Sequence, residues 1–298
     1  MRNLLASAGI AVLSAALVLA CDPLRALSYG SPPPLPASAE EAKKVASSET
    51  PITAAARPSH GSVIGNEGIA AWAGLPETEK QRVNSFRSLF LHQSVGGDLE
   101  DGAKENGYKF NYYEVGSTIA SELGLHGGLT KSPNGEGEAK LAEFRDSVLK
   151  NKTKVRVAIF KFGYGDVTSV SLAKLQPAYQ RTVAAIKAAG VHVLHVTPPL
   201  VFDTADNEAK LQMRTWMQST FKGDVIFDLD DIESTDPSAK RCEIAGVWRV
   251  CPEYRVTASC RSQQNTEADQ TTQGHLCLRT AATKIARSFL YAIYEAGK

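Results

Sequence analysis

Two short apolar stretches decide the fold: Val155-Arg-Val-Ala-Ile-Phe-Lys161 and Val191-His-Val-Leu-His-Val196. Residues 171–189 lie between them and repeat apolar side chains at a spacing near 3.6, which predicts a helix. The repeating positions are Leu172, Leu175, Tyr179, Val183 and Ile186. A strand, a helix and a second strand in this order form a parallel unit, with the helix packed on one face of the sheet.

The same alternation extends in both directions along the chain. Further strands are predicted at 88–92, 109–115 and 224–229, with helices at 98–106, 136–150, 206–221 and 276–296. The stretch between 116 and 135 is rich in glycine and serine, and we expect it to be a loop. Five parallel strands covered by helices on both faces make a three-layer α/β/α domain.

The first 21 residues differ from the rest of the chain. Arg2 precedes an uncharged apolar run that ends at Ala20, as in a secretory signal peptide. The stretch Val18-Leu-Ala-Cys21 resembles the lipobox of bacterial lipoproteins, in which the cysteine is acylated. An uncleaved transmembrane anchor is the alternative, because about 17 apolar residues can just span a bilayer. Both interpretations predict an exported protein held at the cell membrane and facing the periplasm or the cell exterior.

The organisation of the remaining chain follows from its composition. Residues 22–65 are rich in proline, alanine and serine and have no apolar periodicity, so we expect a disordered tether. The folded domain is then expected to cover residues 66–298. The formal net charge of the whole chain is only +1, which gives no electrostatic footprint for nucleic acid. We expect a monomer whose membrane contact is the N-terminal lipid.

Four further cysteines lie in the last quarter of the chain, at Cys242, Cys251, Cys260 and Cys277. In an oxidising compartment they predict two disulfides, and short loops favour the pairs Cys242–Cys251 and Cys260–Cys277. A zinc site is the alternative, but no pair has Cys-x2-Cys spacing. We expect neither a metal nor another cofactor.

Functional side chains of a parallel sheet gather beyond the carboxyl ends of its strands. Ser94 follows the first predicted strand, at a turn where helix N–H groups can stabilise an oxyanion, although it could also be only a helix cap. His275 precedes the last helix and returns to the same edge, where it could supply the base that a serine nucleophile needs. A surface or capping histidine is the alternative. The acidic run at 228–236 indicates helix-start or solvated acids more than a cation site.

Several sequence blocks, in the same order along the chain, resemble those of the SGNH (GDSL-like) hydrolases. The resemblance is to a branch of this family whose first block has the sequence His-Gln-Ser-Val-Gly. The blocks are Phe90-Leu-His-Gln-Ser-Val-Gly96, Gly135-Glu-Gly-Glu-Ala-Lys-Leu-Ala-Glu-Phe144, Ile159-Phe-Lys-Phe-Gly-Tyr-Gly-Asp166, His195-Val-Thr-Pro-Pro-Leu200, Phe227-Asp-Leu-Asp-Asp-Ile-Glu-Ser234 and Gly274-His-Leu276. The resemblance extends from about residue 80 to the C-terminus. It implies a five-stranded parallel sheet in flavodoxin-like order.

The resemblance implies that Ser94 is the nucleophile, with its own N–H in the oxyanion hole, and that His275 is the general base. The family's aspartate three residues before this histidine is Thr272 here. Asp269 is the nearest upstream carboxylate and the candidate third member, with a backbone carbonyl as the alternative.

The oxyanion hole departs from the family pattern as well. Its asparagine corresponds to Gly165 in this chain. We expect backbone N–H groups of the stretch beginning at Gly163, the side chain of Asn134 or the amide of Gln93 to complete the hole. Asp166 is a candidate substrate-side residue, or else caps the loop that follows it.

The expected activity is that of a serine esterase that forms an acyl-enzyme on Ser94. Its expected substrates are small esters, such as acetyl groups on extracellular or cell-wall polysaccharide. An O-acetyltransferase would use the same acyl-enzyme, with a sugar hydroxyl replacing water. A non-catalytic, carbohydrate-binding relic of the fold is the third possibility, because Thr272 and Gly165 depart from the catalytic pattern.

Overall fold

The computed structural model describes residues 61–298, with gaps at 121–122, 258–259 and 261–273. The predicted signal peptide, Cys21 and most of the expected tether lie outside the described residues, and so do Asp269 and Thr272. Among the described residues, no helix is both long and apolar enough to cross a bilayer.

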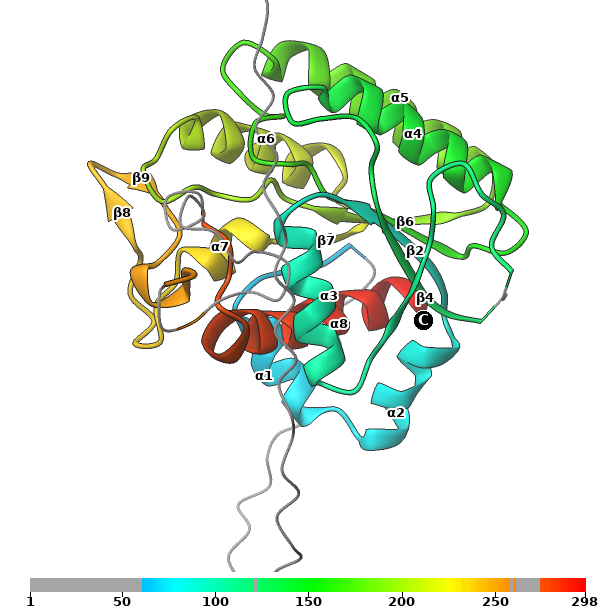
Figure 1. The fold of residues 1–298 in the computed structure, drawn as a ribbon, viewed down its shortest axis with the longest axis horizontal. Coiled ribbons are helices and arrows are strands. Elements are labelled where there is room, and N and C mark those ends of the chain that lie inside the picture. The colour runs from blue at the N-terminus through cyan, green and yellow to red at the C-terminus, as the bar shows by residue number, and fades with distance from the viewer. Residues whose placement is uncertain (1–60, 121–122, 258–259, 261–273) are drawn as a thin grey trace, which may run out of the picture. The chain divides into compact units, whose positions relative to one another are not determined.

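A parallel sheet forms the centre of the domain (Figure 1). Its seven described strands run in the spatial order β1-β7-β6-β5-β2-β4-β3. In chain order they are β1 (Val63–Ile64), β2 (Arg87–His92), β3 (Phe110–Tyr112), β4 (Gly124–Leu129), β5 (Val157–Phe160), β6 (His192–Val196) and β7 (Val225–Phe227). All pair in parallel, as the βαβ pattern predicts.

The predicted count of five strands is wrong, because β1 and β4 were not predicted from the sequence. β4 lies in the stretch expected to be a loop, and it separates β2 from β3 in the sheet. Its sequence, Gly124-Leu-His-Gly-Gly-Leu129, contains three glycines, which are unfavourable in strands and conceal the pattern. β1 lies inside the stretch 22–65 and pairs with β7, so the expected tether was drawn too long at its C-terminal end.

Helices cover both faces of the sheet, in agreement with a three-layer α/β/α architecture. One face packs against α1 (Glu67–Gly74), α3 (Val95–Glu105) and α8 (Thr283–Gly297). The other packs against α4 (Gly137–Lys150), α5 (Leu172–Ala188) and α6 (Asn207–Thr220), as Figure 1 shows. Short helices α2 (Glu77–Gln81) and α7 (Leu229–Glu233) lie in connections, and a π-helical turn (Leu278–Ala282) leads into α8.

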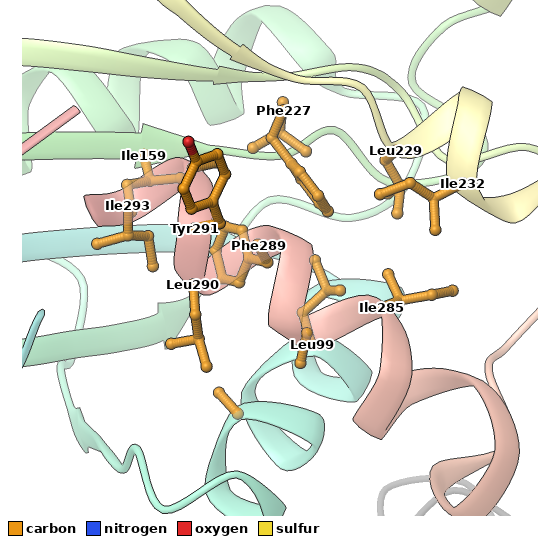
Figure 2. Close-up of a cluster of buried hydrophobic side chains, with 14 of the residues drawn as sticks. Leu99, Ile159, Phe227, Leu229, Ile232, Ile285, Phe289, Leu290, Tyr291 and Ile293 are labelled. Atoms are coloured by element: carbon orange, nitrogen blue, oxygen red, sulfur yellow. The ribbon is translucent and has the colours of Figure 1, made fainter. Parts of the chain in front are cut away.

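Side chains alternate between these two layers along each central strand. In β2, Phe90 faces the layer of α3 and α8, while Leu89 and Leu91 face the opposite layer. Figure 2 shows the first layer, where Phe289 of α8 packs among Phe227, Ile159 and Leu99. Burial of apolar surface on both sides fixes the height and direction of β2 and α3, and therefore of the turn between them.

The cysteine-rich segment is tied to the domain by both predicted disulfides. Cys242 pairs with Cys251 and Cys260 pairs with Cys277, so none of these four thiolates is free to bind zinc. Between the first pair lies a hairpin of β8 (Glu243–Ile244) and β9 (Val247–Trp248), which the sequence did not predict.

Candidate active site

Ser94 occupies a sharp turn between β2 and α3. Its backbone dihedrals are φ 54° and ψ −114°, and the Gly96 N–H donates to the Gln93 carbonyl over 3.2 Å. These values fit the second residue of a type II′ turn, a position that favours glycine. A serine held there is strained, and such strain persists where the surrounding structure imposes it. The turn presents the side chain at the carboxyl end of the sheet.

Three side chains form a hydrogen-bonded relay at this turn. Ser94 Oγ lies 2.7 Å from Nε2 of His275, the contact that the sequence analysis expected. The other ring nitrogen of His275, Nδ1, lies 2.8 Å from Oδ2 of Asp98. An ionised carboxylate accepts from Nδ1–H, which leaves Nε2 free of hydrogen and able to accept the serine proton. The arrangement is that of a nucleophile, a base and an orienting acid.

Asp98 was not predicted, although its position has a simple origin. It lies four residues after Ser94, in the first turn of α3, so both side chains emerge on one side of the helix. Its carboxylate is almost completely buried and also accepts from the Leu276 N–H over 3.0 Å. The positive end of the α3 dipole favours a negative charge there. A spacing of Ser-x3-Asp at a helix start is the signal that could have found it.

His275 is held from several directions. Its carbonyl accepts from the Val256 N–H over 2.8 Å. Gly274 precedes it with a φ of 102°, and a Cβ there would lie 3.0 Å from the Leu200 carbonyl oxygen, so a side chain would be strained and crowded. Cys277 follows two residues later and carries the disulfide to Cys260. The imidazole is therefore fixed by backbone, packing and a covalent bond.

Tyr164 forms one wall of the site and was not singled out in the sequence. Its ring meets the His275 ring edge to face, with centroids 5.7 Å apart. Burial raises the pKa of the Tyr164 hydroxyl well above its usual value, an effect that the charge of Asp98 adds to and the Ser94 side chain opposes. The hydroxyl is therefore neutral and lies close to the nucleophile.

The side-chain amide of Gln93, a predicted oxyanion donor, instead binds the loop after β4. Its amide nitrogen donates to the carbonyls of Thr130 and Ser132, at 3.3 and 2.7 Å. These bonds hold the loop after β4 against the nucleophile turn. Asn134 lies further along this loop, where its side-chain oxygen accepts from Lys140 Nζ over 3.3 Å. Gln93 therefore positions the loop, and its amide hydrogens are committed to backbone oxygens.

Gly163 and Asp166 form a structural clamp, which corrects the expectation that they serve the oxyanion or the substrate. The Gly163 N–H donates to Asp166 Oδ2 over 2.6 Å, and the Gly135 N–H donates to Oδ1 over 2.8 Å. Lys140 Nζ reaches both oxygens, at 2.7 and 2.8 Å, and both side chains are fully buried. Asp166 thus ties the end of β5 to α4, in line with the loop-capping alternative.

A second buried lysine lies behind the site. Lys161 Nζ donates to the Phe162 carbonyl over 2.8 Å, and burial lowers its pKa to about 7. Burial raises the pKa of the nearby Glu233 carboxyl to about 8, while its Oε2 accepts from the Leu200 N–H over 2.9 Å. Because Leu200 contacts the position of Gly274, this carboxyl supports the loop that carries His275.

Several other polar side chains near the sheet have partners of their own. His92 Nε2 lies 3.0 Å from Glu100, and His126 Nδ1 lies 3.3 Å from the Ser88 carbonyl, both buried among strands and α3. The expectation for Asp269 concerns a residue outside the described part of the chain. Asp228 pairs with Arg214 at 2.6 Å, and Asp231 pairs with Arg241 at 2.7 Å, so these acids of the run 228–236 serve ion pairs.

No protein-family model matches this chain, and no curated protein matches it either. The resemblance to SGNH hydrolases therefore has only the sequence blocks given above as its basis.

Proposed function

We propose that the protein is a serine esterase that hydrolyses acyl esters through an acyl-enzyme on Ser94. The observation that carries this proposal is the relay Ser94 Oγ–His275 Nε2 and His275 Nδ1–Asp98 Oδ2, with separations of 2.7 and 2.8 Å. A helix cap would explain Ser94 alone, but the Ser94 side chain makes no capping hydrogen bond to α3.

The chemistry follows from this order of groups. Nε2 of His275 takes the proton of Ser94 as Oγ attacks the ester carbonyl, and the carboxylate of Asp98 stabilises the imidazolium that forms. The tetrahedral oxyanion would be held by the backbone N–H groups of Ser94 and Val95, because those of Gly96 and Gly97 already donate to the carbonyls of Gln93 and Ser94. Collapse expels the alcohol, which takes the proton from His275. Water then attacks the acyl-enzyme by the same route, releasing the acid and regenerating Ser94.

A fluorophosphonate probe tests the proposal directly, since it labels an activated serine irreversibly. We expect labelling of the full chain, complete loss in Ser94→Ala and strong weakening in His275→Ala. Ser219→Ala is a matched control, because Ser219 is an exposed serine on α6. Labelling that persists in Ser94→Ala, or none in the folded wild-type protein, would refute the esterase and leave a non-catalytic carbohydrate binder as the better account.

The acceptor is tested separately with p-nitrophenyl acetate. Water as acceptor predicts a p-nitrophenol release rate that is independent of added glycan. A rate that rises with glycan, together with acetylated product, would indicate an acetyltransferase acting through the same acyl-enzyme.

A further inference from the structure

Two arginines converge on one aromatic ring beside the proposed active site. The guanidinium carbon of Arg255 lies 3.7 Å from the centroid of the Phe202 ring, and that of Arg249 lies 4.2 Å from it. Phe202 belongs to the loop after β6, while Arg249 follows β9 and Arg255 follows the short turn Pro252–Tyr254. Three separate segments thus bring two positive charges onto one aromatic ring.

The backbone places this arginine pair next to His275. Arg255 forms an antiparallel bridge with Leu276, and the following residue donates its N–H to the His275 carbonyl over 2.8 Å. A Cβ on Gly274 would contact the side chain of Val250 and the backbone of Val201, which are neighbours of Arg249 and Phe202. Arg255 and the Tyr164 hydroxyl also influence each other's pKa, and Tyr164 contacts His275.

Neither arginine has a counter-ion among the described residues. Arg214 and Arg241 stack on Trp248 in a similar way, but each also forms an ion pair with a carboxylate. Arg249 and Arg255 form none, and the Nε atom of each is buried without a hydrogen-bond partner.

The electrostatic surroundings agree with this lack of compensation. Burial and the adjacent charge of Arg249 lower the pKa of Arg255, and Asp203 opposes this only in part. A guanidinium nevertheless stays charged at neutral pH. Two crowded, partly desolvated cations with unused donors are unfavourable in the empty protein and suit an anionic ligand.

We propose that Arg249 and Arg255 bind an anionic group, a carboxylate or a phosphate, of the ester that Ser94 attacks. This inference rests on the proposed function and narrows its substrate class to esters with a negative charge close to the scissile bond. Guanidinium groups bind both kinds of oxyanion through paired N–H donors. Stacking on Phe202 holds the planar groups in place and reduces the entropy lost on binding.

Matched neutral and anionic esters test the proposal in the full chain. 4-Acetoxybenzoate and 4-acetoxyphenyl phosphate carry the two anions, and 4-acetoxybenzamide is the neutral counterpart. We expect kcat/KM to be about 10- to 100-fold higher for at least one anionic ester, as one or two charge-assisted hydrogen bonds predict. The better of the two anionic esters identifies the group. Equal rates for all three esters would overturn the proposal.

Variants separate anion binding from a purely structural role. In Arg249→Gln/Arg255→Gln the ratio of kcat/KM for the anionic ester to kcat/KM for 4-acetoxybenzamide should fall to about one, because the neutral ester does not use the charge. Arg279→Gln is the control, since Arg279 is exposed. Phe202→Leu removes the ring and keeps both charges, so it should retain most of the preference. If the double variant keeps the preference, the arginines are not the anion site.

Binding to Ser94→Ala makes the result independent of turnover and of the double variant's stability. Calorimetry should detect 4-acetoxybenzoate or 4-acetoxyphenyl phosphate but not 4-acetoxybenzamide, and Arg255→Gln in the same background should weaken that binding at least about ten-fold. Anion binding without any ester turnover would refute the esterase and keep the anion site. Ester turnover without anion binding would refute the anion site and leave the proposed esterase in place.

Discussion

Asp98 stands four residues after Ser94 in α3, and both side chains contact the same imidazole, that of His275. The proposed nucleophile and its orienting acid therefore come from one short segment, and only the proposed base comes from the far end of the chain. The start of α3 sets the positions of Ser94 and Asp98 relative to each other. The position of His275 depends on how the last loop is anchored.

Asp98→Asn should lower kcat by about 10³- to 10⁴-fold with little change in KM, because an amide cannot stabilise the imidazolium and favours the wrong tautomer. Hydrolysis of p-nitrophenyl acetate at pH 8 measures this. Glu105→Gln is the control, since Glu105 is an exposed acid on the same helix. A larger loss in Asp269→Asn than in Asp98→Asn would contradict the assignment of Asp98.

Ser94→Gly should abolish activity and also stabilise the protein. Glycine adopts φ 54° and ψ −114° without the strain that serine carries there, a relief of about 1–3 kcal/mol that exceeds the entropy glycine adds to the unfolded chain. We expect a net gain near 1 kcal/mol in the free energy of unfolding, measured by urea denaturation. Ser94→Ala keeps a Cβ and should show no such gain; equal stabilisation of both variants would argue against strain at this turn.

Asp101→Asn should stabilise the protein at neutral pH and leave it unchanged in acid. Burial, with the charges of Asp98 and Glu100, raises the pKa of Asp101 to about 6, and its Oδ2 is buried without a hydrogen-bond partner. Because the folded state holds this proton more tightly, the stability that Asp101 contributes is fully present below its unfolded pKa near 4 and is lost as the pH rises through 6.

The gain in Asp101→Asn should therefore be at most about 1 kcal/mol at pH 8, given the partial exposure of the group, and near zero at pH 3.5. Thermal unfolding across this pH range measures the difference. A gain that is independent of pH would mean that the charge of Asp101 is not its origin.

Asp166→Asn should destabilise the domain by about 3–5 kcal/mol, because the Lys140 ammonium would remain buried without its counter-charge. Urea denaturation gives the change in the free energy of unfolding. Lys140→Met/Asp166→Asn leaves no unpaired charge and should lose less than Asp166→Asn alone. If the single and double variants were equally destabilised, the pair would not matter as a pair.

The sequence predicts the layers of this fold well, since the apolar stretches at β2, β5, β6 and β7 are short and bounded by clear helices. It fails at β4, where Gly127 and Gly128 let Glu100 and Tyr113 approach closely. A strand with glycines where other residues come close lacks the alternation of apolar and polar side chains that identifies a strand in sequence. Only its pairing with β2 and β3 shows that Gly124–Leu129 is a strand.

The contact between Ser94 and His275 could be anticipated because both follow predicted elements at one edge of the sheet. The third residue could not, since the family pattern directed attention upstream of His275, whereas Asp98 lies 177 residues earlier in the chain. The expectation for Gly163 and Asp166 failed for another reason. A carboxylate such as Asp166 looks the same in sequence whether it faces a substrate or a buried lysine.

The Cys260–Cys277 bond gives this chain a dependence on its surroundings. The imidazole lies two residues from a covalent cross-link that forms only where thiols are oxidised, so a newly made chain in a reducing cytosol lacks the restraint that aligns its base. Alignment of the base for reaction with an ester would then require an oxidising environment.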